Sequence, residues 1–374
     1  MMIPHAPIRA RCWLALAALA ILPGGCLVDV DAAREGDRDA AAADTASVED
    51  TVSSALDGDG AAEDTAPVIP EGCPTPVITS TTPVGAVLAV PASVVLDGAA
   101  SVPGADGRDI VAYHWEVVRA PDACGPIVLP SLANQANLRA ATVGTYEVRL
   151  TVDDGGGATG CPDARFAFTM VPNSEGIAVE LTWETPGDPD PTDVGPETGA
   201  DLDLHLLHEF ATGGYDGDGD GELDGWFDSQ FDCFWHNSKP NWGSVDPLAD
   251  DDPELVADET IGCGPEVITF ATPEDGKTYR IGVHYWDDHG FGRSTAKIRV
   301  WVRGELVFEQ ARELIDKDLW FVARLAWPSG ELTRVRGCGG TPTPCETDAE
   351  CQGGEACTDR VAPAYVHPLY SNSN

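Results

Sequence analysis

The apolar residues of the chain recur mostly in short runs in which every second position is polar, bounded by Gly, Pro and Asp. In Ile177, Val179, Leu181 and Trp183, for example, the apolar side chains alternate with Ala178, Glu180 and Thr182. Alternate side chains of a strand point to the same face, so this pattern predicts a strand with one apolar face. The same pattern occurs at 93–96, 110–118, 146–152, 202–206, 267–270, 279–286, 296–302, 306–308 and 319–325. A helical period is confined to a short stretch at 310–315, and the sequence therefore predicts an all-β protein.

The predicted strands fall into two groups, which indicates two consecutive β-sandwich domains at 73–173 and 176–335. The second is expected to be a β-sandwich or jelly-roll-like domain with an acidic loop. Residues 26–70, before the strands, are rich in Ala, Asp, Thr and Ser and contain no aromatic residue. Such a segment cannot offset an ordering entropy of ~1–2 kcal/mol per residue, so we expect a disordered acidic linker. Residues 336–374 form a short cysteine-rich tail.

The N-terminus has the features of an export signal. Arg9 and Arg11 precede the apolar run 12–22, which is too short to cross the ~30 Å hydrocarbon core, since a helix needs ~20 residues for that. The following Gly24-Gly25-Cys26 resembles the lipobox of bacterial lipoproteins. This resemblance implies that residues 1–25 are a lipoprotein signal peptide, that Cys26 is acylated, and that acyl chains anchor the protein in the outer membrane of a bacterial cell envelope. The alternative is an ordinary secretory signal with an incidental cysteine.

The charge of the chain limits its partners. With 22 Lys plus Arg against 62 Asp plus Glu, the formal net charge is -40. A nucleic-acid partner is therefore not expected, because no basic patch of sufficient size can be assembled. Such a surface favours cations, although it also serves solubility alone.

The first predicted domain is similar to a PKD domain, which is an immunoglobulin-like module. The matching residues are Val95-Leu96-Asp97-Gly98, Tyr113, Trp115, Gly144-Thr145-Tyr146, Val148, Leu150, Val152 and Asp153-Asp154-Gly155. The resemblance implies that Trp115 fills the core and that Tyr146 lies at the entry to a late strand. It further implies a spacer or adhesion module without chemistry of its own. The loop 119–142 is longer than usual in that family.

The second predicted domain resembles a module that recurs in bacterial lipoproteins behind PKD-like domains. The resemblance is carried by the long stretch 180–208 (ELTWETPGDPDPTDVGPETGADLDLHLLH) together with GWFD at 225–228, NSKPNW at 237–242 and GVHYWDDHGFG at 282–292. It supports architecture and localisation rather than an activity.

The stretch 215–228 reads YDGDGDGELDGWFD. Its Asp216, Asp218, Asp220 and Asp224 match the first nine positions of an EF-hand-type calcium loop, DxDxDGxxD. Position twelve is Phe227 instead of glutamate, and neither flank has the apolar period of an EF-hand helix. We predict a weak structural calcium site, whose shell could be completed by Asp228 or the acids at 250–252. The alternative is a solvated hairpin tip.

Evidence for catalysis is limited, because no GxSxG, HExxH or Walker motif occurs. The strand period places Asp201, Asp203 and His205 on one face, with His208 nearby. Further ligands could come from His284, Asp287, Asp288 and His289. These residues would suit a secreted metal-dependent hydrolase, whereas the alternative is a solvated sheet face beside an acidic turn.

The aromatic residues at 226–242 offer a second functional interpretation. Trp226, Trp235 and Trp242 are interleaved with amides and carboxylates, a combination that suits a carbohydrate-binding module. Alternatively, the aromatic rings form a small core that anchors a long loop.

Outside the cytoplasm, cysteines are expected to form disulfides. We predict that Cys73 pairs with Cys161 and that Cys233 pairs with Cys263, which leaves Cys124 as the odd thiol. Cys338, Cys345, Cys351 and Cys357 should form two bridges, for which three connectivities exist.

Together these features predict a non-catalytic, lipid-anchored cell-surface protein for adhesion or ligand binding, with a calcium-stabilised loop. Its expected partners are the membrane, through the acyl chains, and surface glycans or another surface protein.

Overall fold

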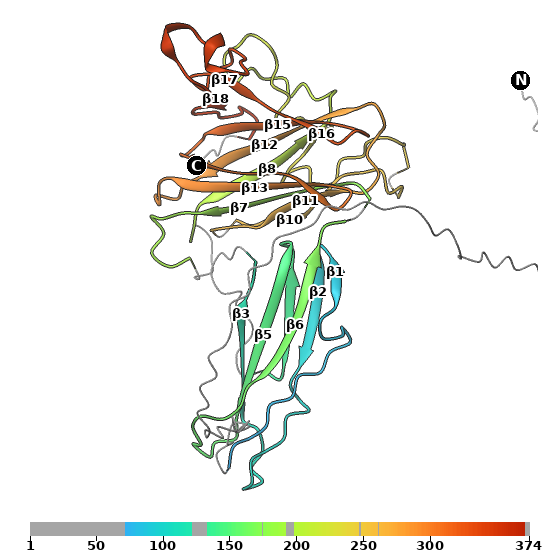
Figure 1. The fold of residues 1–374 in the computed structure, drawn as a ribbon, viewed down its shortest axis with the longest axis vertical. Helices are drawn as coiled ribbons and strands as arrows, with labels where there is room; N and C mark the ends of the chain where they lie inside the picture. Colours follow the sequence, from blue (N-terminus) through green and yellow to red (C-terminus); the bar gives the residue numbers. More distant parts are fainter. Residues whose placement is uncertain are drawn as a thin grey trace, which may run out of the picture. The chain divides into compact units, whose positions relative to one another are not determined.

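The computed structural model describes residues 72–121, 133–173, 175–191, 198–246, 248–260 and 262–370. The predicted signal peptide, the linker, Cys26 and Cys124 lie outside these residues. The regular secondary structure of the described parts consists of strands, apart from two short 3-10 helices at Asp348–Glu350 and Gln352–Gly354 (Figure 1). The predicted all-β class is therefore confirmed. Within the described residues, no helix is both long and apolar enough to cross a membrane.

The first sandwich is built from six strands. They are β1 (Val87–Ala89), β2 (Ala92–Asp97), β3 (Ala112–Arg119), β4 (Gln135–Ala140), β5 (Gly144–Asp153) and β6 (Ala164–Val171). One sheet has the order β1-β6-β5-β3, with β1 parallel to β6, and the other pairs β2 with β4. With β3, β5 and β6 in one sheet and β2 and β4 in the other, the arrangement is that of an immunoglobulin-like sandwich.

Two side chains of the first sandwich occupy the positions that the sequence predicted. Trp115 on β3 is buried in the core and donates its indole N–H to the carbonyl of Ala133 at 3.0 Å. Tyr146, near the start of β5, is buried and donates its hydroxyl to the carbonyl of Thr142 at 3.2 Å. A tyrosine that returns to the backbone just upstream in this way is the tyrosine corner of immunoglobulin-like folds.

The second sandwich has a five-stranded and a six-stranded sheet. The five-stranded sheet has the order β10-β11-β7-β13-β14, and the main path of the other is β16-β15-β12-β8-β9, with β19 added beside β15. The bounds are β7 (Ile177–Glu184), β8 (Asp201–Leu207), β9 (Asp232–Cys233), β10 (Glu254–Ala257), β11 (Glu266–Phe270), β12 (Thr278–Asp287), β13 (Ser294–Val302), β14 (Glu305–Leu314), β15 (Leu319–Ala326), β16 (Glu331–Arg334) and β19 (Val361–Ala362).

The stretch 310–315, where the pattern predicted a short helix, lies mostly in strand β14 instead. Exposed and less exposed positions alternate along this part of the strand, and β14 pairs with β13. This pairing supplies the backbone hydrogen bonds that an isolated helix would have made internally, so tertiary context overrides the local pattern.

Each face of the six-stranded sheet carries a buried apolar cluster. Its inner face, with Leu202, Leu204 and Leu206 of β8, packs against the five-stranded sheet. Its outer face carries a second apolar cluster that sequence analysis did not predict. The members of this cluster come from the sheet, the loop after β8 and the end of the chain, and they are Leu207, Ala211, Trp226, Phe227, Phe234, Leu319, Phe321, Ala362 and Tyr365.

The tail is thus not a unit separate from the second domain. Its first part forms β17 (Arg336–Cys338) and β18 (Cys357–Asp359), which pair with each other. Its later part adds β19 to β15 and continues to Tyr365, whose backbone N–H donates to the carbonyl of Lys317 at 2.7 Å. The last described residues therefore cover the outer face of the six-stranded sheet.

Candidate functional site

The strand register brings the predicted polar residues together on the outer face of the six-stranded sheet. Asp203 of β8 lies opposite His284 of β12, and His205 lies opposite Gly282. A Cβ on Gly282 would lie 2.5 Å from the ring of Trp226, so the absence of a side chain there allows this tryptophan to rest on the sheet. The predicted common face is therefore present, but it is covered rather than solvated.

His205 forms a buried pair with Asp232. Its Nδ1 is 2.7 Å from Oδ2 of Asp232, and the same oxygen accepts the backbone N–H of Phe227 at 2.7 Å. The His205 ring is surrounded by Trp226, Phe227 and Phe234. Its Nε2 is buried and has no hydrogen-bond partner among the described residues. The His–Asp pair is thus enclosed by aromatic rings on the covered face of the sheet.

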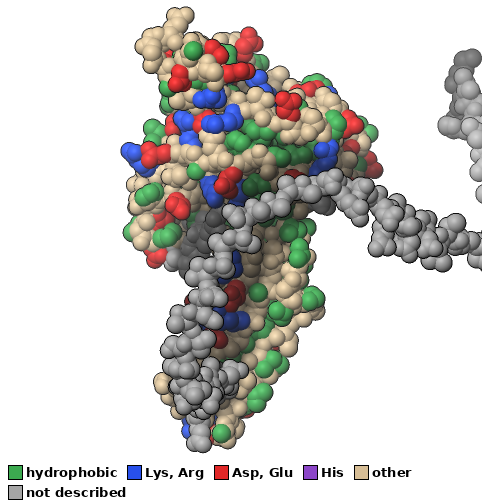
Figure 2. All heavy atoms as spheres, in the orientation of Figure 1, with side chains coloured by type: hydrophobic (Ala, Val, Ile, Leu, Met, Phe, Trp, Pro, Cys, Tyr) green, Lys and Arg blue, Asp and Glu red, His purple; other side chains and the backbone are tan. Residues whose placement is uncertain are grey.

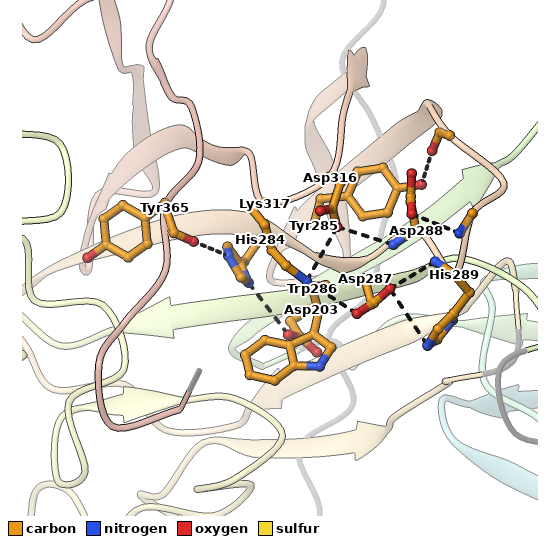
Figure 3. Close-up of polar contacts among 12 residues, drawn as sticks. Asp203, His284, Tyr285, Trp286, Asp287, Asp288, His289, Asp316, Lys317 and Tyr365 are labelled. Atoms are coloured by element: carbon orange, nitrogen blue, oxygen red, sulfur yellow. Dashed lines mark hydrogen bonds and ion pairs between the residues drawn. The ribbon is translucent and has the colours of Figure 1, made fainter. Parts of the chain in front are cut away.

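His284 is held by the tail. Its Nε2 is 2.9 Å from the carbonyl oxygen of Tyr365, and its Nδ1 is 3.8 Å from Oδ2 of Asp203 (Figure 3). Burial lowers the pKa of His284 to about 3, so the ring is neutral under ordinary conditions. Burial also raises the pKa of Asp203 to about 7, an effect that the nearby His205 partly offsets.

Two further carboxyl groups lie near Asp203. Burial and then the charge of Asp203 raise the pKa of Asp201 to about 8. Burial also raises the pKa of Glu266 on β11, whose Oε2 accepts the backbone N–H of Leu204 in the middle of β8. Within the described residues, Asp203, His205 and His284 do not form a group whose ligand atoms all lie within 4.8 Å of one another. The structure therefore does not assemble the metal-hydrolase site that these residue types suggested.

The other polar residues that the sequence suggested as ligands lie in separate parts of the domain. His208 is buried, with Nε2 3.2 Å from Glu274. At the end of β12, Asp287 and Asp288 converge with Asp316, and the ammonium of Lys317 lies 3.3 Å from Asp287 and 3.4 Å from Asp316 (Figure 3). His289 donates its backbone N–H to Asp287 at 2.9 Å, and its Nδ1 lies 2.7 Å from the carbonyl oxygen of Gly199. The lysine thus already supplies a positive charge to this acidic group.

The acidic loop brings three of its four predicted ligands together. One carboxylate oxygen each from Asp216, Asp218 and Asp224 lies within 4.8 Å of the others. Asp216 also accepts the backbone N–H groups of Gly219 and Gly221 at 2.8 and 3.0 Å. Asp224 accepts the N–H of Gly217 at 2.7 Å, and burial raises the pKa of its carboxyl group.

The fourth predicted ligand, Asp220, does not join this group. Its carboxylate lies 2.9 Å from the guanidinium of Arg360, which also pairs with Asp218. The proposed additional ligands are likewise engaged elsewhere. Asp228 accepts four backbone N–H groups, from Thr212, Gly213, Gln230 and Phe231. Asp251 accepts the N–H of Ser244, and Asp252 accepts that of Trp242.

The tryptophans do not form an exposed binding platform. Trp226 is 1% exposed and Trp242 is 2% exposed, while Trp235 is half-buried. Their neighbours are other rings, including Phe321 beside Trp226 and Tyr279 beside Trp242. Sugar recognition by the faces of Trp226 and Trp242 is therefore wrong, and the alternative of an aromatic core that anchors the loop is correct.

The cysteines pair partly as expected. The structure joins Cys73 to Cys161, Cys338 to Cys351 and Cys345 to Cys357. The predicted bridge between Cys233 and Cys263 is wrong, because both are thiols. Cys233 lies on β9 in the six-stranded sheet, whereas the carbonyl of Cys263 accepts the N–H of Trp183 on β7 in the facing sheet. Facing sheets lie ~10 Å apart, further than a disulfide spans.

The fold and these contacts define an all-β chain with an immunoglobulin-like sandwich and a second sandwich whose outer face is closed by an acidic loop and the tail. No family model and no curated protein matches the chain. The chain is similar to the PKD domain of the KIAA 1837 protein, with 25% identity over 24% of this chain and 83% of that one, at a TM-score of 0.19.

Two further solved structures show weaker likeness. Surface layer protein SbsC, domains 4-9, is 10% identical over 65% of this chain and 32% of that one, with a TM-score of 0.18. The adhesin InvE of Yersinia pseudotuberculosis is 12% identical over 76% of this chain and 73% of that one, with a TM-score of 0.16. The assignment of the fold class rests on the strand order and cores described above.

Proposed function

We propose that this chain is a non-catalytic, lipid-anchored protein of the bacterial cell surface, whose second sandwich is stabilised by calcium. The observation that carries the calcium assignment is the convergence of Asp216, Asp218 and Asp224 at the acidic loop. Their oxygen atoms are hard donors, which suit calcium better than zinc. Calcium takes six to eight oxygen ligands, so backbone carbonyls and water would complete the shell.

The residues of the loop fit a weak site. Backbone N–H groups hold Asp216 and Asp224 in place, which reduces the ordering cost of binding. Arg360 should weaken calcium binding, because its guanidinium competes with a cation for Asp218. We therefore expect a dissociation constant of ~0.1–1 mM, in the range of extracellular calcium modules.

The burial of the candidate catalytic residues favours a non-catalytic role. His205, His284 and Asp203 are at most 3% exposed, and rings or the tail cover them. A general base must come within ~3 Å of the proton that it removes, directly or through one water. Side chains sealed in this way do not meet that requirement.

The surface location is supported by the N-terminal sequence and by the disulfides. The order of Arg9, the apolar run and Gly24-Gly25-Cys26 suits acylation of Cys26. Three disulfides suit an oxidising compartment. In this proposal the linker carries the two sandwiches away from the outer membrane, where they meet another surface protein or a glycan.

Calcium binding is tested by thermal melting of the 72–374 fragment in ~1 mM calcium and in chelator. With a dissociation constant of ~0.1 mM, calcium increases the free energy of unfolding by about 1.4 kcal/mol, which raises the melting temperature by a few degrees. Asp216→Asn should remove this difference. Asp246→Asn is the matched control, because Asp246 also accepts a backbone N–H, from Leu248, but lies outside the converging group. Equal melting temperatures of the parent in both buffers would refute the calcium site.

The anchor is tested separately in cells. Metabolic labelling with an alkyne fatty acid should tag the full chain, and Cys26→Ser should abolish the tag and release the protein from the membrane fraction. A tag that persists in Cys26→Ser would refute acylation at this residue.

A further inference from the structure

A cavity of about 230 Å³ opens beside the acidic loop, on the outer face of the six-stranded sheet. Its lining comes mainly from the loop, from β12 and β15 and from the tail, and it includes the apolar side chains of Trp226, Ile281 and Phe321 and the guanidinium groups of Arg280, Arg324 and Arg360. The lining is thus apolar at its base and charged at its rim. None of the residues considered for catalysis lines it.

The arginines of the cavity are unusual in so acidic a chain. Three of the 22 Lys and Arg side chains line this one cavity, although the net charge of the chain is -40. On the visible face of the second sandwich, basic and acidic side chains otherwise lie intermixed (Figure 2). A concentration of arginine beside apolar side chains is typical of sites that recognise carboxylates or phosphates.

Two of these arginines face each other directly across neighbouring strands. Arg280 of β12 and Arg324 of β15 are register partners, and directly opposite residues have Cβ atoms ~4.5–5.5 Å apart. Like charges in this position destabilise a sheet. Burial lowers the pKa of Arg280; the charge of Asp232 opposes this effect, and the charge of Arg324 adds to it. An anion between the two guanidinium groups would remove this repulsion.

The hydrogen bonds show which arginine is available. Arg280 donates to the carbonyls of Asp224 and Ala211, at 2.6 and 2.9 Å, and Arg360 is engaged by Asp218 and Asp220. Arg324 is exposed, and its guanidinium makes no hydrogen bond or ion pair within the described part of the chain. Its guanidinium can therefore bind a carboxylate in a two-pronged geometry without breaking an existing contact.

The acidic residues at the rim indicate which groups a ligand would carry besides the carboxylate that Arg324 binds. Asp220 is neutralised by Arg360, whereas Glu222 is exposed at the same cavity. Carboxylates accept hydrogen bonds from hydroxyl groups, so a ligand that carries one carboxylate and several hydroxyls matches both kinds of rim residue. The volume is below the ~300–1,000 Å³ of sites for drug-sized molecules, which indicates a ligand of monosaccharide size.

We propose that this cavity binds a sugar acid, a monosaccharide unit with a carboxylate, through Arg324 with the support of Arg280. This site lies beside the loop proposed to hold calcium but does not depend on it. It also differs from recognition by Trp226 and Trp242, because the recognising groups are charged and the rings only form the base.

The experiment is a calorimetric or NMR titration of the 72–374 fragment with galacturonate and, separately, with galactose, in calcium and in chelator. Galacturonate should bind at least tenfold more tightly than galactose. Arg324→Ala should weaken galacturonate binding at least tenfold. The control Arg293→Ala removes another exposed arginine, one that pairs with Glu313, and should leave binding unchanged.

Melting temperatures separate binding from folding. Because Arg324→Ala removes a like-charge pair, the variant should be at least as stable as the parent without ligand. The proposal is overturned if neither sugar binds, if both bind equally, or if Arg324→Ala binds galacturonate like the parent. A clear loss of stability in Arg324→Ala would show a structural role and would also overturn it. Galacturonate should bind equally well in calcium and in chelator. The sugar-acid site is thus judged by this titration and the calcium site by the melting temperatures, so the two proposals fail independently.

Discussion

Arg360 forms an ion pair with Asp218, which lies 142 positions earlier in the chain. Asp218 is 2% exposed in its side chain, and Arg360 is 13% exposed. The guanidinium also stacks over the ring of Phe321, at 4.2 Å from its centroid. This one arginine therefore joins the tail, the sheet and the acidic loop.

The first prediction concerns this ion pair. Arg360→Ala leaves Asp218 buried without its positive partner, and we expect a loss of about 2 kcal/mol in the free energy of unfolding in chelator. In ~1 mM calcium the loss should be smaller, because a cation can then take the place of the guanidinium, and the calcium affinity of the variant should rise. Denaturant unfolding in both buffers measures the difference.

Arg293→Ala serves as the control for this measurement. Arg293 and Glu313 are both more than half exposed, so their pair should contribute less than ~1 kcal/mol and should not respond to calcium. An equal loss for Arg360→Ala in the two buffers would contradict competition between the arginine and calcium.

The second prediction concerns Gly282 and Trp226. Gly282→Ala places a methyl group where the ring of Trp226 now lies, since the added atom would be 2.5 Å from that ring. We expect a loss of about 1–3 kcal/mol in the free energy of unfolding and a red shift of tryptophan emission as the ring is displaced. In a Trp226→Leu background the smaller side chain leaves room for the added methyl group, so Gly282→Ala should lower the free energy of unfolding by less. A cost that is identical in both backgrounds would show that the two positions are not coupled.

The third prediction concerns the thiol of Cys233. This side chain is fully buried, and burial raises the pKa of its thiol. Alkylation under native conditions should therefore leave Cys233 unmodified, whereas alkylation in denaturant should label it fully. Peptide mapping without reductant should find no peptide that joins Cys233 to Cys263. Recovery of such a peptide would restore the disulfide that the sequence suggested.

The strands of both sandwiches could be predicted because apolar alternation reports directly on a sheet with one buried face. The inner residues Leu202, Leu204 and Leu206 are an example. The alternation also placed Asp203 and His205 on one face, for which a metal site and a solvated surface were the two alternatives, and the structure shows that this face is covered. The loop after β8 and the tail cover this face. Their contacts with the sheet depend on tertiary packing, which the local alternation of residues does not report.

The acidic loop shows the same limit. The spacing of its carboxylates is a local property, and it predicted that Asp216, Asp218 and Asp224 converge. Asp220 instead pairs with Arg360. Arg360 belongs to the cysteine-rich tail, which the sequence predicts to be a separate unit, so this pairing could not be predicted from the loop. The predicted disulfide between Cys233 and Cys263 was wrong for a similar reason, because the sequence spacing of two cysteines does not show to which sheet each of them belongs.

The buried ionisable groups predict how stability depends on pH. The folded-state pKa values of Asp203 and Asp201 are raised to about 7 and about 8, from unfolded values near 4. Their folded forms hold protons that the unfolded chain has already lost, so their contribution to stability falls as pH rises from about 4 to 8. His284 acts in the opposite direction. Its folded pKa of about 3 lies below the unfolded value near 6.5, so its contribution grows as pH rises between these values and is constant above 6.5.

The fourth prediction follows for the window from pH 6.5 to 8, where the histidine contribution no longer changes and the two carboxyl groups still titrate. The melting temperature of the 72–374 fragment in chelator should fall as pH rises through this window. Asp203→Asn mimics the protonated carboxyl group and should make the fall less steep, because one of the titrating groups is gone. Asp250→Asn, at an exposed acid of a neighbouring loop, should leave the slope unchanged. A melting temperature that rises between pH 6.5 and 8, or a slope that Asp203→Asn does not alter, would show that these carboxyl groups are ionised in the folded protein.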